Sequence, residues 1–241
     1  MGRAQGTVGV SAPRGVIVTG GTGALGRAVV RLLLAQGTRV VVPFRRAEEW
    51  RQLQSEAGAA LFGFEADLSD AAQAQGLVER AAAELGVLDG VALVAGGWAG
   101  GTSFDTAPAD EWTRMLRGNL DSAAYVCRAA LPLLRKQAGA IVAVGSRAAL
   151  TGGAGMAAYA VSKVALHALV RVLAQENRGR GVRVNAVLPG TIDTPANRAA
   201  MKDADTSAWT SPEAIARVVL FLLSSDSAST TGALVPVDAP G

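Results

Sequence analysis

The sequence predicts an α/β fold of the doubly wound type, in which a mainly parallel, seven-stranded sheet carries helices on both faces. Short runs of β-branched residues alternate with longer stretches of helical periodicity, which is typical of βαβ units. A glycine-rich turn directly follows the first of these runs. No repeat, proline-rich linker or charge block divides the 241 residues, a length that one α/β domain can have. We therefore expect a single domain over residues 15–241, preceded by a flexible extension over residues 1–14.

Seven runs are short, rich in Val, Ile, Leu and Phe, and bounded by glycine or polar residues, as buried parallel strands are. The predicted strands are 16–19, 39–44, 61–64, 90–95, 140–144, 182–188 and 234–237. The predicted helices are 25–36, 47–57, 71–85, 110–134, 159–178 and 211–223. Several of these helices follow residues that favour a helix start: Ser69 with Asp70, Asp110, and Ser211 before Pro212. Since no second domain is predicted, the substrate pocket must come from loops at the carboxyl ends of the strands.

Composition excludes several classes of function. The 23 basic and 20 acidic residues give a net charge of +3, and the arginines are scattered, so we expect no nucleic-acid partner. The single cysteine, Cys127, lies in an apolar helical pattern and indicates a buried thiol in a reducing compartment. With only one histidine, His167, no metal site of the usual zinc type is expected. We see neither a secretory signal nor an uninterrupted apolar span of roughly 18 residues, so we expect a cytoplasmic protein without a membrane partner.

The glycine-rich turn after the first strand has the spacing of a dinucleotide-binding fingerprint. The strand 16–19 runs into a loop in which Gly21-x-Gly23-x-x-Gly26 precedes a helix. Such glycines let backbone N–H groups approach a pyrophosphate at the helix N-terminus, and the last one lets helix and strand pack closely. The cofactor contacts predicted here are Thr19, Gly20, Gly21, Thr22, Gly23, Leu25 and Gly26.

The end of the second predicted strand indicates which dinucleotide is bound. An NAD site has Asp or Glu there to hold the ribose 2′-hydroxyl, whereas this chain reads Phe44-Arg45-Arg46. No carboxylate at this point repels a 2′-phosphate, and two guanidinium groups can bind one. We therefore favour NADP(H) over NAD(H). The alternative is that Arg45 and Arg46 are solvated charges that open the next helix.

A serine, a tyrosine and a lysine follow the fifth predicted strand. Ser146 comes just after the strand, and Tyr159-x-x-x-Lys163 opens the next helix, which places phenol and ammonium on one helical face. A neighbouring cation favours phenolate, so we expect the pKa of Tyr159 to be lowered toward neutrality. The chain has twenty arginines and three lysines, so a lysine here indicates a chemical requirement.

With these motifs the chain resembles the short-chain dehydrogenase/reductase family, from about residue 15 to residue 238. The segment 185–194, which contains Pro-Gly, and the late Thr231-Gly232 also fit the family's pattern. The resemblance implies a Rossmann-type fold and a family catalytic set of Asn, Ser, Tyr and Lys. The positions that match this set are Asn119, Ser146, Tyr159 and Lys163.

The resemblance also implies a role for each of these residues. Tyr159 is the general acid in reduction, Lys163 holds the nicotinamide ribose and lowers the tyrosine pKa, Ser146 orients the substrate carbonyl, and Asn119 holds a relay water. Asp67 and Leu68 would lie by the adenine, and Ile192 and Thr194 would hold the carboxamide. Further predicted cofactor contacts are Ala95, Gly96, Pro189 and Gly190. Val94 stands where the family usually has Asn, whose side-chain amide connects neighbouring strands. We expect packing to replace that connection here.

The resulting expectation is a carbonyl reductase or alcohol dehydrogenase that moves a hydride between NADP(H) and a small carbonyl or alcohol substrate. A cofactor-sensing protein on the same scaffold is the main alternative; an epimerase or dehydratase would carry an extra C-terminal region. The candidate substrate contacts are Trp98, Ser146, Leu150, Met156 and Tyr159. We expect Arg147 to form a structural salt bridge and His167 to pack its helix. The resemblance further implies a homotetramer or homodimer built on helices 110–134 and 159–178.

Overall fold

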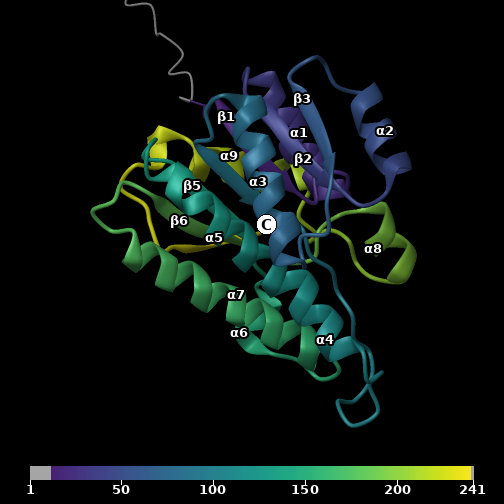
Figure 1. Ribbon diagram of the computed structural model, residues 1–241. Helices are drawn as coiled ribbons and strands as arrows, with labels where there is room; N and C mark the ends of the chain where they lie inside the picture. The colour runs from purple at the N-terminus through teal and green to yellow at the C-terminus, as the bar shows by residue number, and fades with distance from the viewer. Residues whose placement is uncertain (1–11, 240–241) are drawn as a thin grey trace, which may run out of the picture.

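Seven parallel strands form one sheet in the order β3-β2-β1-β4-β5-β6-β7 (Figure 1) in the computed structural model, which describes residues 12–239. The strands are β1 Gly15–Thr19, β2 Arg39–Phe44, β3 Leu61–Glu65, β4 Gly90–Leu93, β5 Ala140–Val144, β6 Arg183–Pro189 and β7 Leu234–Val237. The chain winds outward from β1 in one direction to β3 and then in the other direction from β4 to β7. This reversal beside β1 creates the crevice where such folds bind ligands. The predicted doubly wound α/β fold is confirmed.

Helices cover both faces of the sheet, as Figure 1 shows. They are α1 Ala24–Ala35, α2 Ala47–Ser55, α3 Ala71–Leu85, α4 Glu111–Leu116, α5 Ser122–Leu134, α6 Ala148–Thr151, α7 Ala157–Glu176, α8 Pro195–Ala200 and α9 Pro212–Leu223. One hydrophobic core joins α3, α5 and α7 to the sheet and includes Cys127, which is buried as predicted. The second core lies on the opposite face, where α1 and α9 pack together. The sheet is therefore buried on both sides, which explains its almost uninterrupted apolar strands.

Four local features differ from the sequence prediction. The predicted helix 110–134 is interrupted by a π-helical turn, Arg117–Asp121, which joins α4 to α5. The short helices α6 and α8 lie in segments that were expected to be loops. The fourth strand ends at Leu93, so residues 94 and 95 belong to the following loop. Helix α7 begins at Ala157, two residues before Tyr159.

The predicted N-terminal extension is described only from Ala12 onward, because residues 1–11 lie outside the described part of the chain. The Pro13 carbonyl accepts a hydrogen bond from the Thr38 hydroxyl at 2.7 Å. The Arg14 backbone N–H donates to the Asp89 carboxylate at 3.1 Å. Residues 13 and 14, which were assigned to the extension, are thus hydrogen-bonded to the domain.

Helix α7 is 20 residues long and apolar enough that length and composition alone would allow it to cross a membrane. In the fold it packs on β6, with Leu166, Val170 and Ala174 in the hydrophobic core. Core helices of globular proteins meet the same criterion, and the buried face of α7 is part of the hydrophobic core. No other helix among residues 12–239 meets it.

Candidate active site

The phosphate loop between β1 and α1 has a backbone that only glycine accommodates at two positions. Gly20 has a φ of 65°, in the left-handed region, and a Cβ on it would lie 2.8 Å from the Ala95 backbone. A Cβ on Gly26 would lie 2.0 Å from the Gly20 carbonyl oxygen. These contacts place α1 directly against the turn and confirm the structural part of the fingerprint.

The N-terminus of α1 is built to receive an anion. Gly23 is the N-cap residue and provides no side-chain hydrogen bond to the first helical turn. Backbone N–H groups at such an end, together with the helix dipole, favour a phosphate. The residues therefore fit the pyrophosphate of a dinucleotide, with Thr22 and Leu25 on either side of the cap.

Beyond β2, the aromatic rings of Phe44 and Trp50 stack, with centroids 5.4 Å apart and planes at 4°. Arg46 is exposed and forms an ion pair with Glu49. The second Glu49 carboxylate oxygen accepts a hydrogen bond from the Thr22 hydroxyl at 3.2 Å. A carboxylate thus lies between the phosphate loop and Arg46. The residues at the end of the second strand give no signal of this carboxylate, because Glu49 reaches the loop from helix α2.

The Asp67 side chain, just after β3, stabilises the turn in which Asp67 itself lies. Its carboxylate accepts hydrogen bonds from the Ser69 N–H at 2.9 Å and the Ser69 hydroxyl at 2.8 Å. These two bonds lower the pKa of Asp67, and the positive charges of Arg45 and Arg117 lower it further. Asp67 is therefore ionised at neutral pH, and Arg45 lies close enough to it to interact. The next residue, Leu68, is buried in the core.

The junction of β1 with the loop after β4 is held by Thr19. Its hydroxyl accepts the Ala95 N–H at 3.1 Å and contacts the Ala92 carbonyl at 3.5 Å. Val94 packs against the hydrophobic core, as expected where the family has an amide. Packing of Val94 and the hydrogen bond of the Thr19 hydroxyl together connect β1 to the loop after β4. The packing was expected from the sequence, whereas the hydrogen bond was not.

Asn119 lies on the π-helical turn and is almost fully buried. Its Oδ1 accepts the Gly97 N–H at 2.8 Å, and its Nδ2 donates to the Gly97 carbonyl at 3.1 Å and to the Ser162 hydroxyl at 2.9 Å. The amide therefore joins the loop after β4 to helix α7. A Cβ on Gly96 would lie 2.6 Å from Asn119 Oδ1 and 3.3 Å from Lys163 Nζ, so these three residues meet at one point.

Lys163 is 5% exposed and donates from Nζ to the Val144 carbonyl at 2.8 Å. Burial lowers its pKa to about 8, from an ordinary value of 10.5. One of its three hydrogens is used by Val144, so the others can bind a further acceptor. The lysine therefore joins the carboxyl end of β5 to the helix that carries Tyr159.

Ser146 follows β5 and is buried. Its N–H donates to His167 Nε2 at 3.2 Å, and its side chain lies close enough to the Tyr159 phenol to lower the pKa of that phenol. His167 is therefore more than the packing residue that was predicted, since it fixes the backbone of a candidate catalytic residue. Burial, then the charges of Lys163 and Arg171, lower the pKa of His167 to about 4, which keeps it a neutral acceptor.

The expected lowering of the tyrosine pKa is wrong for the protein by itself. Burial raises the pKa of Tyr159 above its ordinary value of 10, and the Ser146 side chain offsets this only in part. The i, i+4 spacing does place Lys163 one turn away, but its ammonium is directed to Val144. The phenol is therefore protonated at neutral pH, which is the form a general acid requires.

The segment after β6 leads into α8. Ile192 pairs with Thr210, and the Thr194 hydroxyl caps α8 by accepting the Asn197 N–H at 3.1 Å. A hydroxyl that accepts in this way can still donate to another group. Arg147 forms the predicted structural salt bridge, to Asp238 at 2.6 Å. That ion pair lies beside Gly190, where a Cβ would be 3.5 Å from the guanidinium.

The candidate substrate residues lie in the loop after β4 and in the segment from the end of β5 into α7, which includes α6, and these two segments touch each other. The Gly101 N–H donates to the Gly155 carbonyl at 2.7 Å, which joins the loop after β4 to the loop before α7. Trp98 and Leu150 are 61% and 55% exposed, and Met156 directly precedes α7. The structure thus brings the predicted segments together and leaves large apolar side chains on their surface.

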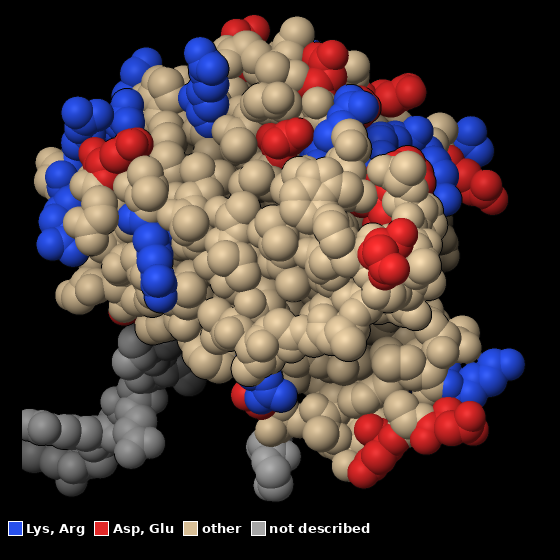
Figure 2. Space-filling view, turned by 90° about the horizontal axis from the view of Figure 1, so that it is seen from below, with Lys and Arg blue, Asp and Glu red and all other residues tan. Residues whose placement is uncertain are grey.

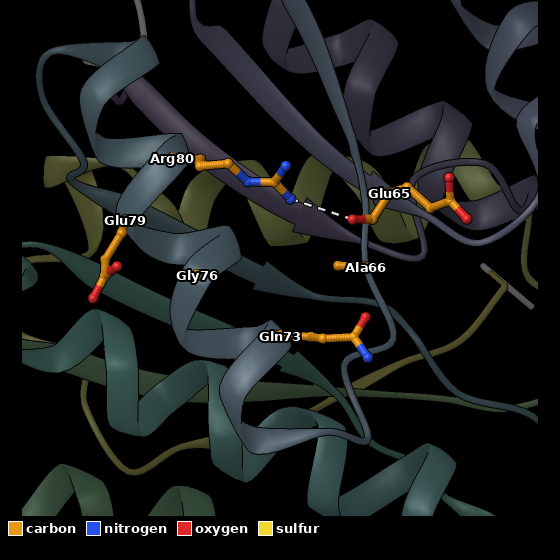
Figure 3. Close-up of a pocket in the computed structure, with 6 residues that line it drawn as sticks. All are labelled: Glu65, Ala66, Gln73, Gly76, Glu79 and Arg80. Carbon is orange, nitrogen blue, oxygen red and sulfur yellow. Dashed lines mark hydrogen bonds between the residues drawn. The ribbon is translucent and has the colours of Figure 1, made fainter.

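A separate cavity of about 290 Å³ lies between β3 and α3 (Figure 3). Arg80 points across it from α3, donates to the Glu65 carbonyl at 3.2 Å, and lies 4.7 Å from the centre of the Phe64 ring. Gln73 lines the same cavity and accepts the Asp67 N–H at 2.9 Å. The cavity therefore lies at the outer edge of the sheet, and none of the four catalytic candidates lines it.

Comparisons with known proteins agree with this geometry. A family model described as enoyl-(acyl carrier protein) reductase matches residues 21–239. The chain is 35% identical to 2-(S)-hydroxypropyl-CoM dehydrogenase 3 of Xanthobacter autotrophicus, with 92% of this chain and 94% of that protein covered. It is 29% identical to 3-oxoacyl-[acyl-carrier-protein] reductase FabG of Salmonella typhimurium, with 92% and 94% covered.

Among solved structures, a short-chain oxidoreductase from Pseudomonas aeruginosa PAO1 with an atypical catalytic center matches with a TM-score of 0.86. That match has 29% identity and covers 93% of this chain and 95% of the other. The fold, the glycine loop and the near full-length match lead to one conclusion. The chain belongs to the short-chain dehydrogenase/reductase family, whose members are oxidoreductases that bind NAD(H) or NADP(H).

Proposed function

We propose that the protein is an NADP(H)-dependent carbonyl reductase or alcohol dehydrogenase in which Tyr159 transfers the proton. The observation that carries this proposal is the meeting of Asn119, Ser146, Tyr159 and Lys163 at the carboxyl ends of β4 and β5. They lie at the same edge of the sheet as the phosphate loop, because all seven strands are parallel.

In this mechanism the bound dinucleotide supplies or accepts the hydride. The Ser146 hydroxyl holds the substrate oxygen, and the neighbouring Tyr159 phenol donates a proton to it during reduction. The Tyr159 phenol, whose pKa burial raises above its ordinary value, is protonated at neutral pH, which is the form that donates a proton during reduction. Lys163 keeps two hydrogens free for a ribose, while its bond to Val144 fixes its position. Asn119 holds the loop at Gly97 in place beside them.

The preference for NADP(H) is proposed from the basic residues that follow β2. Arg45 and Arg46 are exposed there, and guanidinium groups bind phosphate through paired, charge-assisted hydrogen bonds. No Asp or Glu stands at the end of β2 itself. Dissociation constants of NADP⁺ and NAD⁺ test this preference directly, and tighter binding of NAD⁺ would contradict it.

We propose a small ketone or secondary alcohol with an apolar portion as the substrate. The loop after β4 exposes Trp98 and helix α6 exposes Leu150, and these side chains suit an apolar group. The relatives' names, a hydroxypropyl dehydrogenase and a 3-oxoacyl reductase, also describe chemistry at a hydroxyl or keto group. The proposed location of the protein is the cytoplasm.

The test is NADPH oxidation against a panel of ketones, aldehydes, quinones and keto thioesters, with Tyr159→Phe measured beside the natural chain. Loss of the phenolic proton should lower kcat by about 10²- to 10⁴-fold, while the dissociation constant of NADPH changes little. A chain that binds NADPH but reduces no member of the panel would favour the cofactor-sensing alternative. Equal turnover by Tyr159→Phe would exclude Tyr159 as the acid.

A further inference from the structure

The contacts of Glu49 place a carboxylate at the point where the two dinucleotides differ. The ribose 2′ position of a bound dinucleotide lies near the end of the second strand, beside the phosphate loop. Glu49 spans these two segments: one oxygen accepts from the Thr22 hydroxyl of the loop at 3.2 Å, and the other pairs with Arg46 after β2. Glu49 and Arg46 therefore lie in the region where a group on the 2′ position would be bound.

Glu49 is held there by the packing of helix α2, so it is not a freely moving surface side chain. Arg27 donates to the Thr22 carbonyl at 2.9 Å and to the Glu49 carbonyl at 3.4 Å, which fastens the first turn of α2 to the loop. The next residue, Trp50, stacks on Phe44, and a Cβ on Gly63 would lie 2.4 Å from its ring. These contacts leave α2 little freedom to carry the carboxylate away.

From this geometry we infer that Glu49 reduces the preference for NADP(H) over NAD(H) by opposing a 2′-phosphate. The carboxylate neutralises Arg46, and its negative charge repels a phosphate that approaches the same guanidinium. A 2′-hydroxyl, in contrast, can donate a hydrogen bond to Glu49. The inference deepens the proposed function and rests on it, since it assumes that a dinucleotide occupies the loop. In the natural chain Glu49 thus weakens a preference for NADP(H) that Arg45 and Arg46 create.

The test measures dissociation constants of NADP⁺ and NAD⁺ by titration calorimetry for the natural chain and for Glu49→Gln, which keeps the shape but removes the charge. The matched control is Glu48→Gln, because Glu48 is exposed on the same helical turn and forms no hydrogen bond or ion pair with any described side chain. Glu49→Gln should bind NADP⁺ about tenfold more tightly, equivalent to about 1.4 kcal/mol, while NAD⁺ binding stays constant or weakens. Glu48→Gln should change neither constant.

A second arm replaces Arg46 by Gln, alone and together with Glu49→Gln. If Glu49 acts partly by neutralising Arg46, the gain in NADP⁺ affinity from Glu49→Gln shrinks when Arg46 is absent. If Glu49→Gln increases NADP⁺ affinity equally with and without Arg46, Glu49 acts only by repelling the 2′-phosphate. That result would overturn the role of the ion pair between Glu49 and Arg46. A loosened helix α2 would weaken both cofactors equally and leave their ratio unchanged.

The outcomes separate the inference from the proposed function. A ratio of the two constants that changes less than threefold in Glu49→Gln, or equally in Glu48→Gln, overturns the inference while dinucleotide binding stands. A natural chain that binds neither dinucleotide overturns the proposed function. A natural chain that prefers NAD⁺ contradicts the NADP(H) preference, yet a tenfold shift of the ratio in Glu49→Gln still supports the role of Glu49.

Discussion

At the residue scale, His167 and Lys163 are buried polar groups at the candidate active site, and His167 positions the candidate catalytic residue Ser146. His167 Nε2 accepts the Ser146 N–H at 3.2 Å, an arrangement that requires a neutral ring with its proton on Nδ1. A Cβ on Gly145 would lie 2.4 Å from the same nitrogen, so the ring is packed against the backbone that leads to Ser146. Its contribution is therefore to the placement of Ser146.

Replacement of His167 separates this positioning role from simple packing. His167→Leu fills the space but removes the acceptor, which leaves the Ser146 N–H unsatisfied and displaces the serine. We expect kcat for carbonyl reduction to fall about tenfold, the effect of roughly 1.4 kcal/mol at the transition state. His167→Gln retains an acceptor and should recover much of that loss. Equal kcat values for the two variants, at similar stability, would assign His167 to packing alone.

Lys163 makes stability depend on pH in a predictable direction. Burial lowers its pKa to about 8 in the folded chain, whereas the unfolded chain retains the ordinary value of 10.5. Between these values the unfolded state binds more protons, so the free energy of unfolding rises with pH. Relative to Lys163→Met, the natural chain should gain up to about 3 kcal/mol from pH 8 to pH 10.5. Urea unfolding of both chains without cofactor, repeated across this pH range, measures the difference in their free energies of unfolding. A difference that stays constant with pH would contradict the lowered pKa of Lys163.

The sequence identified Asn119, Ser146, Tyr159 and Lys163 because their spacing and positions match a family pattern. It did not predict the contacts of Glu49 or the direction of the Tyr159 pKa. Both depend on tertiary packing: Glu49 reaches the phosphate loop because α2 is fastened to it, and burial raises the pKa of Tyr159 while the Lys163 ammonium is directed to Val144. Spacing along one helix contains no information about such neighbours from other elements.

At the scale of elements, the strands could be predicted closely because buried parallel strands are apolar along their whole length and end at glycine or polar residues. The π-helical turn Arg117–Asp121 could not, since the apolar pattern of 110–134 continues through it. Helices α6 and α8 are four and six residues long, too short for periodicity to distinguish them from loops. The missed elements are thus those that tertiary contacts stabilise.

Two predicted helix starts provide a matched test of capping. The Asp70 side chain accepts the Gln73 N–H at 2.9 Å at the start of α3, whereas Asp110 makes no such bond at the start of α4. Asp70→Ala should lower the free energy of unfolding by about 1 kcal/mol. Asp110→Ala should change it by less than about 0.5 kcal/mol. Chemical denaturation measures both, and equal losses would contradict the assignment of the cap.

At the scale of the whole molecule, one broad face carries few charged side chains (Figure 2). Helix α7 exposes Val161, Val164 and Val172. We expect this helix, with α4 and α5, to contribute to a homotetramer or homodimer, because its apolar residues exceed what packing on the sheet requires.

Light scattering tests the predicted assembly. The natural chain should have the mass of four or two chains at micromolar concentration, and Val164→Glu should shift it toward a single chain. Ala83→Glu adds the same charge on α3, where the side chain is exposed, and should leave the mass unchanged. A natural chain that scatters as one copy would exclude the assembly.

The bond between the Gly101 N–H and the Gly155 carbonyl couples the two segments that line the proposed substrate entrance. A Cβ on Gly100 would lie 2.4 Å from that same carbonyl, so neither segment can be rebuilt without disturbing the other. Attempts to redirect the enzyme toward new compounds should therefore graft both segments from one donor, because a chimaera that exchanges only one of them would mismatch the backbones where they touch.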